Sequence, residues 1–537
     1  MSSLFARRRF LSQSGILIGG TALSGSALVS GCGGASSANA PAVITSDKER
    51  PKLLSGIQFG DVTPNQAIVW SRADRNAQMI VEYDTSDKFS NPSRIVGPFA
   101  TAATDFTTRV DLTGLPAGQL LNVRVRYVDP GDGRIESEVL SGQFRTAPGS
   151  DSSKPVRFHW SGDNAGQGWG INTEFGGVKI YEAMRKRDPD FFIHSGDTIY
   201  ADGPIAAEVP AENGRIWKSI VTEEVSKVAE TLKEYRGRHS YNTLDLNYRK
   251  FAAQVPQIWQ WDDHEVVNNY SGSKDLSADA RYTEKNVATL AARGQRAFLE
   301  YAPMRYFKQS EPQRIYRSLS YGPLLDVFVL DMRSYRGPNT ANKQTVEDAN
   351  SAYLGPAQID WLITELKASK AVWKVIAADM PIGVYVPDGT DATGATRWEA
   401  SANGDDGPAS GRELELARLL KNIKTIKNVA WITADVHYCA ANYYDPARAA
   451  FTDFAPFWEF VAGPMNAGSF GPNKLDMTFG PTTVFQKVPP KANASPFAGF
   501  QFFGEMTIDP QSKALTVELI DLDGVSQFKK VLAPEGV

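Results

Sequence analysis

The stretch FIHSGDTIYADG, residues 192–203, joins a short apolar run to a polar turn. The apolar residues lead directly into Gly196 and Asp197, and Tyr200 follows three positions later. An almost continuously apolar strand is typical of a parallel sheet that is covered on both faces. Gly196 allows the backbone to turn tightly, so the strand presents the Asp197 carboxylate at the end of the sheet. This stretch therefore predicts an α/β domain with a functional group at a strand end.

Strands and helices alternate on both sides of this stretch, from residue 155 to residue 537. Apolar runs predict strands at VRFHW (156–160), DFFIHSG (190–196), PQIWQ (256–260), LLDVFVLDM (324–332), VWKVIAADM (372–380) and NVAWITADV (428–436). Helical periodicity marks GGVKIYEAMRKRD (176–188), TEEVSKVAETLKEY (222–235), PAQIDWLITELKAS (356–369) and ELELARLLKNI (413–423). This alternation predicts a large α/β domain of layered sheets flanked by helices.

A different pattern precedes this domain, between residues 53 and 148. Short runs alternate apolar and polar residues between turn signals, at QAIVWSRA (66–73), AQMIVEYD (77–84), FTTRVDL (106–112), LLNVRVRYVD (120–129) and SGQFRTAP (141–148). Such runs are typical of an all-β sandwich of the fibronectin or immunoglobulin type. Because the segment contains no His or Cys, we expect a structural or docking module.

The N-terminus resembles an export signal, which we expect to occupy residues 1–31. Arg7 and Arg8 precede an apolar pair in the manner of a twin-arginine signal, and LVSGC ends in a lipobox-like cysteine, Cys32. We expect cleavage before Cys32, a lipid anchor on its thiol, a linker over residues 32–52, and a periplasmic or cell-surface location. The alternative is soluble release after SANA, residues 37–40.

Composition and charge exclude some classes of function. The 61 acidic and 57 basic residues give a net charge of −4, and no long basic run is present. The electrostatic footprint of a nucleic-acid-binding protein is therefore missing. Cys32 and Cys439 are the two cysteines, so lipidation of Cys32 leaves no intrachain disulfide, and stability must come from the core.

Acidic residues follow five of the predicted strands. The motifs supply Asp163 with Asn164, Asp197 with Tyr200, Asp262 and Asp263 with His264 and Glu265, Asp379, and Asp435 with His437. One aspartate after a strand is usually a turn former or helix cap. Function in such sheets gathers beyond the carboxyl ends of the strands, so five such positions, two of them with one of the five histidines, indicate a common site.

Carboxylates that converge in one cleft repel one another unless a cation lies among them. Carboxylate, phenolate and imidazole groups are suitable ligands for hard dications or ferric iron. Two metal ions that share one bridging carboxylate form a clamp for in-line displacement at phosphorus. We therefore predict a two-metal site, with Asp197 as the bridge and Tyr200 as a ligand of the harder ion.

These motifs resemble those of a known family. SGDN, GDTIY, WDDHE, LDMRSYR and ADVHY, preceded by a sandwich and a twin-arginine signal, are similar to the PhoD-like alkaline phosphatase/phosphodiesterases, a branch of the calcineurin-like metallophosphoesterases. The resemblance covers nearly the whole mature chain, and WDDHEVVNNY with GDTIY is its most specific part. It includes FVAGPMNAG, residues 460–468, for which the sequence offers no physical account.

The resemblance implies roles for individual residues. The metal ligands would be Asp163, Asp197, Tyr200, Asp263, Asp379, Asp435 and His437. His264 would contact a phosphoryl oxygen or protonate the leaving group. The best-known members have a cysteine ligand where this chain has Asp163. The family suggests ferric iron plus calcium, and a set of oxygen and nitrogen ligands also suits manganese or zinc.

Arg333, His194 and Cys439 have two interpretations each, and Asn164 has one. Arg333 can bind phosphate through its guanidinium group or form a structural ion pair. Asn164 can donate a hydrogen bond to phosphate. For His194 we favour a hydrogen-bonded residue of the core over a ligand. For Cys439 we favour a small buried hydrophobe over a nucleophile.

We therefore predict a monomeric, metal-dependent phosphoric ester hydrolase that acts on monoesters and diesters. A first alternative is a phospholipase-like hydrolase of lipid head groups, whose pocket would be shaped by PFWEF (456–460), NAGSFGPN (466–473) and the loop 387–407. Loops of this length are often lids, and disorder is an equal interpretation. A second alternative is a tethered binding protein in which the sandwich docks a partner and the metal cleft is degenerate.

Overall fold

The computed structural model describes residues 46, 48–306, 308 and 310–536. The predicted signal peptide, Cys32 and the linker up to residue 45 lie outside the described residues. In the part of the chain that is described, none of the helices combines the length and apolar character needed to cross a bilayer.

The N-terminal region forms the predicted β-sandwich. One sheet, in the order β4-β3-β6-β7, consists of β3 (Ala77–Asp84), β4 (Ser93–Ala100), β6 (Leu120–Val128) and β7 (Leu140–Arg145). The facing strands are β1 (Ile57–Gly60), β2 (Gln66–Arg72) and β5 (Thr107–Thr113). Alternate residues of β6, such as Val123 and Val125, are fully buried in the core between them. This burial is the physical basis of the period-2 pattern in the sequence.

The sandwich shares a sheet with the α/β domain. Strand β1 pairs in parallel with β12 (Gln257–Gln260), where Gly60 lies opposite Gln257. The resulting nine-stranded sheet has the order β24-β23-β22-β8-β9-β12-β1-β2-β5. In the sequence the sandwich ends at about residues 148–155. In space, the backbone hydrogen bonds of its strands β1, β2 and β5 continue into the sheet of the α/β domain.

The rest of the nine-stranded sheet comes from the α/β domain. Its strands are β8 (Val156–Ser161), β9 (Phe191–Ser195), β22 (Phe502–Ile508), β23 (Leu515–Asp521) and β24 (Ser526–Leu532). Strands β8, β9 and β12 run parallel, and β22 to β24 are antiparallel. The parallel strands are the apolar runs that the sequence predicts.

A seven-stranded sheet forms the second layer, in the order β13-β14-β15-β18-β20-β19-β21. Its strands are β13 (Arg317–Tyr321), β14 (Leu325–Val329), β15 (Trp373–Ala377), β18 (Val429–Thr433), β19 (Cys439–Tyr444), β20 (Phe457–Val461) and β21 (Pro481–Lys487). The two sheets bury one apolar core between them, to which Phe158 and Trp160 contribute from one sheet and Val375 and Ile432 from the other.

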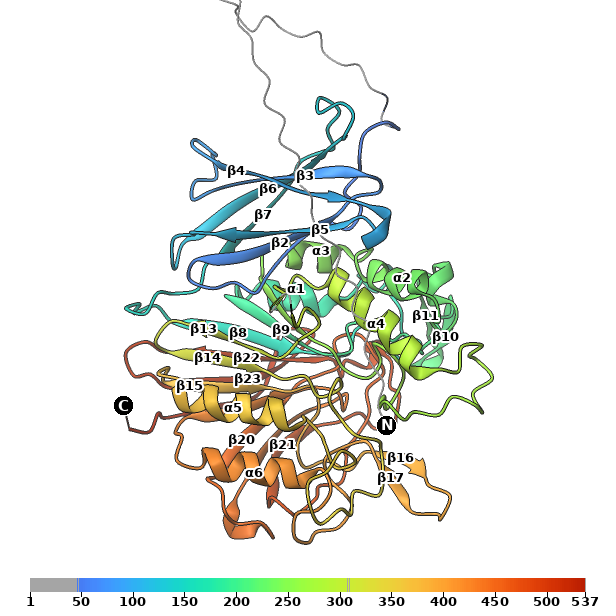
Figure 1. The fold of residues 1–537 in the computed structure, drawn as a ribbon, viewed down its shortest axis with the longest axis vertical. Coiled ribbons are helices and arrows are strands. Elements are labelled where there is room, and N and C mark those ends of the chain that lie inside the picture. Colours follow the sequence, from blue (N-terminus) through green and yellow to red (C-terminus); the bar gives the residue numbers. More distant parts are fainter. Residues whose placement is uncertain (1–45, 47, 307, 309, 537) are drawn as a thin grey trace, which may run out of the picture. The chain divides into compact units, whose positions relative to one another are not determined.

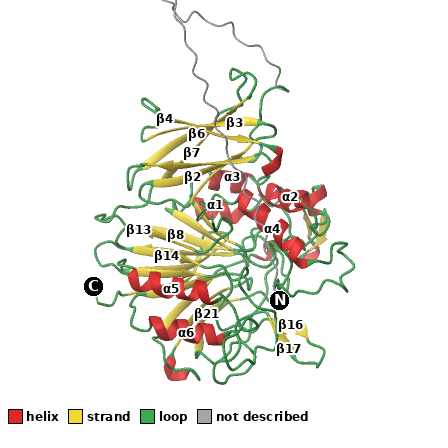
Figure 2. Cartoon of the chain, in the orientation of Figure 1, coloured by secondary structure: helices red, strands yellow, loops and turns green. Residues whose placement is uncertain are grey.

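Helices cover the outer faces of both sheets (Figures 1 and 2). Helices α1 (Lys179–Arg185) and α3 (Leu246–Ala252) pack on the nine-stranded sheet. Helices α5 (Pro356–Ala368) and α6 (Glu413–Ile423) pack on the seven-stranded sheet. Helices α2 (Leu232–Asn242) and α4 (Val287–Tyr301) share a third cluster with Trp70 and Trp259. The predicted arrangement, a β-sandwich followed by layered sheets flanked by helices, is confirmed.

The predicted helix over residues 222–235 is wrong in its first half. The chain forms only a 3-10 turn at Glu223–Val225, and α2 begins at Leu232. Thr231 caps this helix: its Oγ1 accepts a hydrogen bond from Glu234 N at 3.3 Å, while a Glu234 carboxylate oxygen accepts from Thr231 N at 2.8 Å. This capping box fixes the start of the helix. Val228 and Ala229 are nevertheless buried, which explains the misleading apolar pattern.

Candidate metal centre

The strand-end residues of both sheets meet in one cluster of mostly buried side chains. Three sets of residues could each hold a metal ion, because the ligand atoms within each set lie within 4.8 Å of one another. The sets are Asp163, Asp197 and His437; Asp197, Asp263 and His264; and Asp262, Asp263 and Asp435. Asp197 belongs to two of these sets, as a bridging ligand would. Asp263 is likewise shared. The structure therefore brings together most of the residues that the sequence singles out, and it places Asp262, which has no assigned role in the sequence analysis, among the potential ligands.

Left-handed backbone conformations concentrate at these turns. The φ angles are 67° at Asp163, 48° at Asp197, and 61° at both Asp435 and His437. Non-glycine residues seldom adopt this region, and such conformations gather at functional sites. Gly196 has φ 88°, and a Cβ atom there would lie 2.4 Å from Cβ of Asp262. The glycine of the opening stretch is therefore required for the close approach of two ligand loops.

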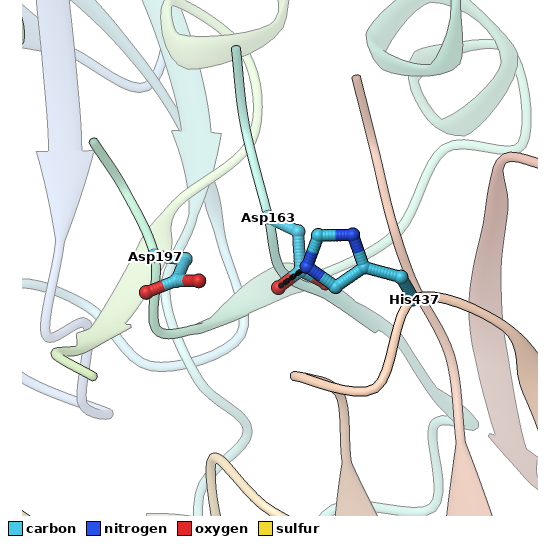
Figure 3. A group of neighbouring side chains, drawn as sticks. All are labelled: Asp163, Asp197 and His437. Carbon is cyan, nitrogen blue, oxygen red and sulfur yellow. Dashed lines mark ion pairs between the residues drawn. The ribbon is translucent and has the colours of Figure 1, made fainter. Parts of the chain in front are cut away.

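The first set contains a neutral imidazole (Figure 3). The figure shows Asp163 between Asp197 and His437, with the Asp163 carboxylate facing the imidazole ring. His437 Nε2 lies 3.5 Å from Asp163 Oδ1 and 2.8 Å from the Tyr200 hydroxyl. Burial lowers the pKa of His437 to about 4, so the ring is neutral at pH 7. Because Nδ1 donates to the Gly468 carbonyl, the lone pair of Nε2 is available for a metal ion.

The carboxylates of the site resist ionisation unless a cation is present. Burial, followed by the neighbouring carboxylates, raises the pKa of Asp163 and Asp197 well above the usual value. Three buried oxygens have no hydrogen-bond partner among the described residues: Asp163 Oδ2, Asp262 Oδ2 and Asp263 Oδ1. Such atoms are costly to bury unless a cation contacts them. The donor set therefore fits metal ions, as hard oxygen ligands with one or two imidazoles.

Arg333 and Asp379 lie beside these sets. The Arg333 side chain is fully buried and pairs with Asp262 and Glu399, and its nearest approach to Asp379 is 3.5 Å. Asp379 Oδ1 also accepts a hydrogen bond from Met380 N at 2.7 Å. In this position Arg333 forms the ion pairs that its structural interpretation predicts, and Asp379 is not part of any of the three sets.

His264 is paired with a carboxylate that the sequence analysis did not single out. Its Nδ1 lies 2.6 Å from Asp202 Oδ1, and its ring packs on Tyr200 with centroids 4.1 Å apart. Although burial opposes the charged form, Asp202 and Asp263 raise the pKa of His264 to about 9. Among the described residues, none forms a hydrogen bond with the other ring nitrogen, Nε2. Asp202 stands two residues after Tyr200 in the opening stretch. This closeness to two site residues is the sequence feature that could have identified it.

The buried Glu265 carboxylate forms hydrogen bonds with two of the ligand loops. Its Oε1 accepts hydrogen bonds from the backbone N and the hydroxyl of Thr198, both at 2.6 Å. Its Oε2 accepts from Asp262 N at 2.7 Å. Thr198 follows Asp197 in the chain, so one buried carboxylate holds the turns after β9 and β12 together.

The segment FVAGPMNAG now has a physical role. Met465 N donates to the Gly162 carbonyl at 2.9 Å, and Asn466 N donates to the Asp163 carbonyl at 3.1 Å. Gly463 lies against the same aspartate, since a Cβ atom there would come within 2.5 Å of Asp163 Oδ2. Residues 460–468 therefore form a wall of the site that fixes the Asp163 turn.

Within the loop 387–407, residues 387–398 form a hairpin. Strands β16 (Pro387–Thr390) and β17 (Thr396–Trp398) pair antiparallel. Asp388 accepts hydrogen bonds from Asn269 Nδ2 at 3.0 Å, Asn339 Nδ2 at 2.8 Å and Lys274 Nζ at 2.9 Å. Asn269 N in turn donates to the Asp263 carboxylate. The hairpin is thus tied to a ligand loop through one side chain.

Three further residues lie as follows. His194 is buried in the core, and burial lowers its pKa to about 3. Cys439 lies in the apolar core between the two sheets, so no thiol contributes to the three sets. Asn164 is buried next to Asp163, and its backbone N donates to the Asp197 carbonyl at 3.0 Å.

Family models match two parts of the chain. The model of the PhoD-like phosphatase family matches residues 158–519, and that of the PhoD-like phosphatase N-terminal domain matches residues 36–148. Alkaline phosphatase D of Bacillus subtilis (strain 168) is 30% identical over 311 residues. That alignment covers 56% of this chain and 50% of the relative, so the chain spans about half the length of the curated relative it matches.

Solved structures share the fold. The structure of PhoD matches with a TM-score of 0.67 and 20% identity, covering 91% of this chain and 90% of that chain. A purple acid phosphatase from yellow lupin (Lupinus luteus) seeds matches with a TM-score of 0.53 and 13% identity, covering 90% of this chain and 74% of that chain. At these identities the likeness establishes a common architecture.

Proposed function

Because the chain belongs to the PhoD-like phosphatase family, we propose that it hydrolyses phosphoric esters at a centre of two metal ions. The observation that carries this proposal is the run of three ligand sets in which neighbouring sets share a carboxylate, first Asp197 and then Asp263. A carboxylate shared between two sets suits a pair of ions a few ångströms apart. The unpartnered buried oxygens of Asp163 and Asp263 support the same assignment.

The residues divide between two positions. We assign Asp163, Asp197, Tyr200 and His437 to the first ion, and Asp197, Asp263 and Asp435 to the second. Bound ions would supply positive charge against the phosphoryl oxygens and lower the pKa of the attacking water. All of these donors are oxygen or nitrogen atoms, which supports iron, manganese, zinc or calcium at the site rather than a metal that prefers thiolates.

His264 is the proposed general acid. As an imidazolium it can transfer its Nε2 proton to the leaving alkoxide while the bond between phosphorus and that oxygen breaks. The Asp202 carboxylate, 2.6 Å from Nδ1, orients the ring and stabilises its protonated form. Asn164 is proposed as a neutral donor to a phosphoryl oxygen.

The charge distribution supports monoesters and diesters as substrates. Arg333, the arginine that contacts these carboxylates, already pairs with Asp262 and Glu399. A site without a dedicated cation for the second negative charge of a monoester does not select the monoester over a diester. We propose small phosphate esters as the substrate class.

Hydrolysis of an aryl phosphate monoester and an aryl phosphate diester tests this function directly. The mature protein is assayed as purified, after chelation and after the return of single metals. We expect both activities to fall together on chelation and to recover with the same ion. Activity on both esters that survives complete metal removal would contradict the proposal.

We also propose export by the twin-arginine route with a lipid anchor on Cys32. The support is the sequence alone, through Arg7, Arg8 and the lipobox-like residues before Cys32. Fractionation of cells that express the full chain and a Cys32→Ser variant tests it. The expected result is a membrane-bound protein that becomes soluble in the variant, and equal solubility of both would contradict the anchor.

A further inference from the structure

A small chamber lies next to the two ligand turns that contain Asp163 and Asp197. Asn164 and Thr198, which follow the ligands Asp163 and Asp197, form part of its lining. Gln58 of strand β1 forms another part, so the sandwich reaches this chamber. The space open to the centre of a water molecule is about 10 Å³, which is near the minimum of roughly 10–15 Å³ that one ordered water needs.

Five of the residues that line the chamber carry polar side-chain atoms without partners. Gln58 Oε1, Asn164 Oδ1, Tyr181 OH, His194 Nδ1 and both ring nitrogens of His239 form no hydrogen bond with any described residue. Each of these residues is at most 2% exposed. They come from five separate segments of the chain, including β1, α1, β9 and α2. Buried polar atoms are nearly always paired with protein or ordered water. A group of six unpaired atoms around one chamber therefore requires a ligand.

The lining excludes a charged ligand. None of the residues that line the chamber is Asp, Glu, Lys or Arg. Burial lowers the pKa of both His194 and His239 to about 3, so each ring is neutral and offers one donor and one acceptor. A ligand that both donates and accepts, carries no charge and fits this volume is water.

We propose that this chamber is a hydration site whose ordered water joins Gln58, Tyr181 and His239 to Asn164. Water that donates to Asn164 Oδ1 fixes the amide group and directs its nitrogen away from the chamber. The role of Asn164 toward phosphate rests on the proposed function, whereas the hydration site does not. The sandwich thereby contributes Gln58 to the support of the metal-site loops.

A matched pair of variants tests the hydration site. Tyr181 and Tyr321 are both 1% exposed and both have an unpartnered hydroxyl, but only Tyr181 lines the chamber. Tyr321 belongs instead to the apolar core between the sheets. Removing a hydroxyl that binds water costs a hydrogen bond, while removing a hydroxyl without a partner relieves a desolvation penalty.

We therefore expect Tyr181→Phe to lower the melting temperature by about 2 °C. The melting temperature of Tyr321→Phe should stay unchanged or rise. A crystal structure of the full protein should show density for water within hydrogen-bond distance of Tyr181 OH and His239. A rise of melting temperature in Tyr181→Phe together with an empty chamber would overturn the proposal.

A Gln58→Leu variant tests the connection to Asn164. With an unchanged metal content, we expect kcat for an aryl phosphate ester to fall on the order of 10-fold, by analogy with lost outer-shell partners. Unchanged kinetics would overturn the connection. If the wild-type protein shows no metal-dependent hydrolysis, the proposed function fails, and the melting temperatures of the tyrosine pair still decide the hydration site.

Discussion

Two buried histidine–carboxylate pairs of similar geometry differ in their charge. In the candidate metal centre, His264 Nδ1 lies 2.6 Å from Asp202. Between β8 and β22, His159 Nε2 lies 2.8 Å from Glu505. Burial lowers the pKa of His159, whereas the pKa of His264 is about 9 despite burial. The distance within a pair therefore does not decide which form of the imidazole is present.

The surrounding charges explain the difference. Glu505 accepts two hydrogen bonds from Arg187, at 2.8 and 2.9 Å, so a permanent cation already balances it. His264 instead faces Asp263 and Asp262 in addition to Asp202, and these raise its pKa. One pair is suited to hold a proton for transfer, and the other ties two strands together. The first predictions below alter one pair or its surroundings and use the other pair as the control, and the last one alters the hairpin and has its own control.

The largest effect is expected for Asp197→Ala. Loss of the shared carboxylate should remove metal binding and with it several kcal/mol of transition-state stabilisation, so activity falls on the order of 10³-fold or more. Monoesterase and diesterase rates should fall together. Glu505→Gln is the control and should keep both rates. Retention of either activity in Asp197→Ala would mean that another site performs it.

Glu505→Gln should instead destabilise the fold. Burial would raise the pKa of Glu505, but hydrogen bonds from Arg187 and His159 lower it to about 2, below its usual value of 4.5. The ionised group therefore stabilises the protein above about pH 4.5, and this contribution is lost as the pH falls toward 2. Denaturant unfolding at pH 7 should show a loss of about 3 kcal/mol. A difference that persists unchanged at the lowest pH would contradict this origin.

Asp202→Asn should reduce kcat by about 10- to 100-fold, the range for partners that orient a functional histidine. Because the negative charge of Asp202 raises the pKa of His264, its removal should move the alkaline limb of the pH–rate profile to lower pH. The Glu505→Gln profile should coincide with that of the wild type. An unshifted alkaline limb in Asp202→Asn would show that His264 is not the acid that limits the rate.

The smallest effect is expected at the hairpin. Asp388→Asn weakens hydrogen bonds from Asn269, Asn339 and Lys274 and should raise KM for a bulky diester roughly fivefold, or about 1 kcal/mol. Asp391 in the exposed tip of the same hairpin bonds only within the tip, so Asp391→Asn is the matched control. Equal KM values for both variants would exclude the hairpin from substrate binding.

The sequence was sufficient to predict the site residues that directly follow strands. Asp163, Asp197 and Asp435 could be predicted because the end of a strand is visible in the apolar pattern, and parallel strands end at one edge of a sheet. The fold classes of both domains followed from the same periodicities. The start of α2 was missed because a local capping box outweighed the apolar spacing.

Features that depend on distant partners could not be predicted. Nothing in the sequence shows that Arg333 turns toward Glu399, or that Gly463 packs against Asp163. The Asp202 pair and the chamber behind Asn164 likewise arise only when several segments meet. The shared sheet between the sandwich and the α/β domain rests on one parallel contact of β1 with β12, which no local pattern indicates.

Metal binding by protein from which the metal has been removed with a chelator is the most direct test of the proposed two-metal centre. Calorimetric titration with a single divalent ion, followed by measurement of the bound metal per chain, should give two ions for the wild type. Asp197→Ala should bind fewer ions, while Glu505→Gln should still bind two. A folded wild-type protein that binds no metal, or an Asp197→Ala variant that binds two as tightly, would contradict the account.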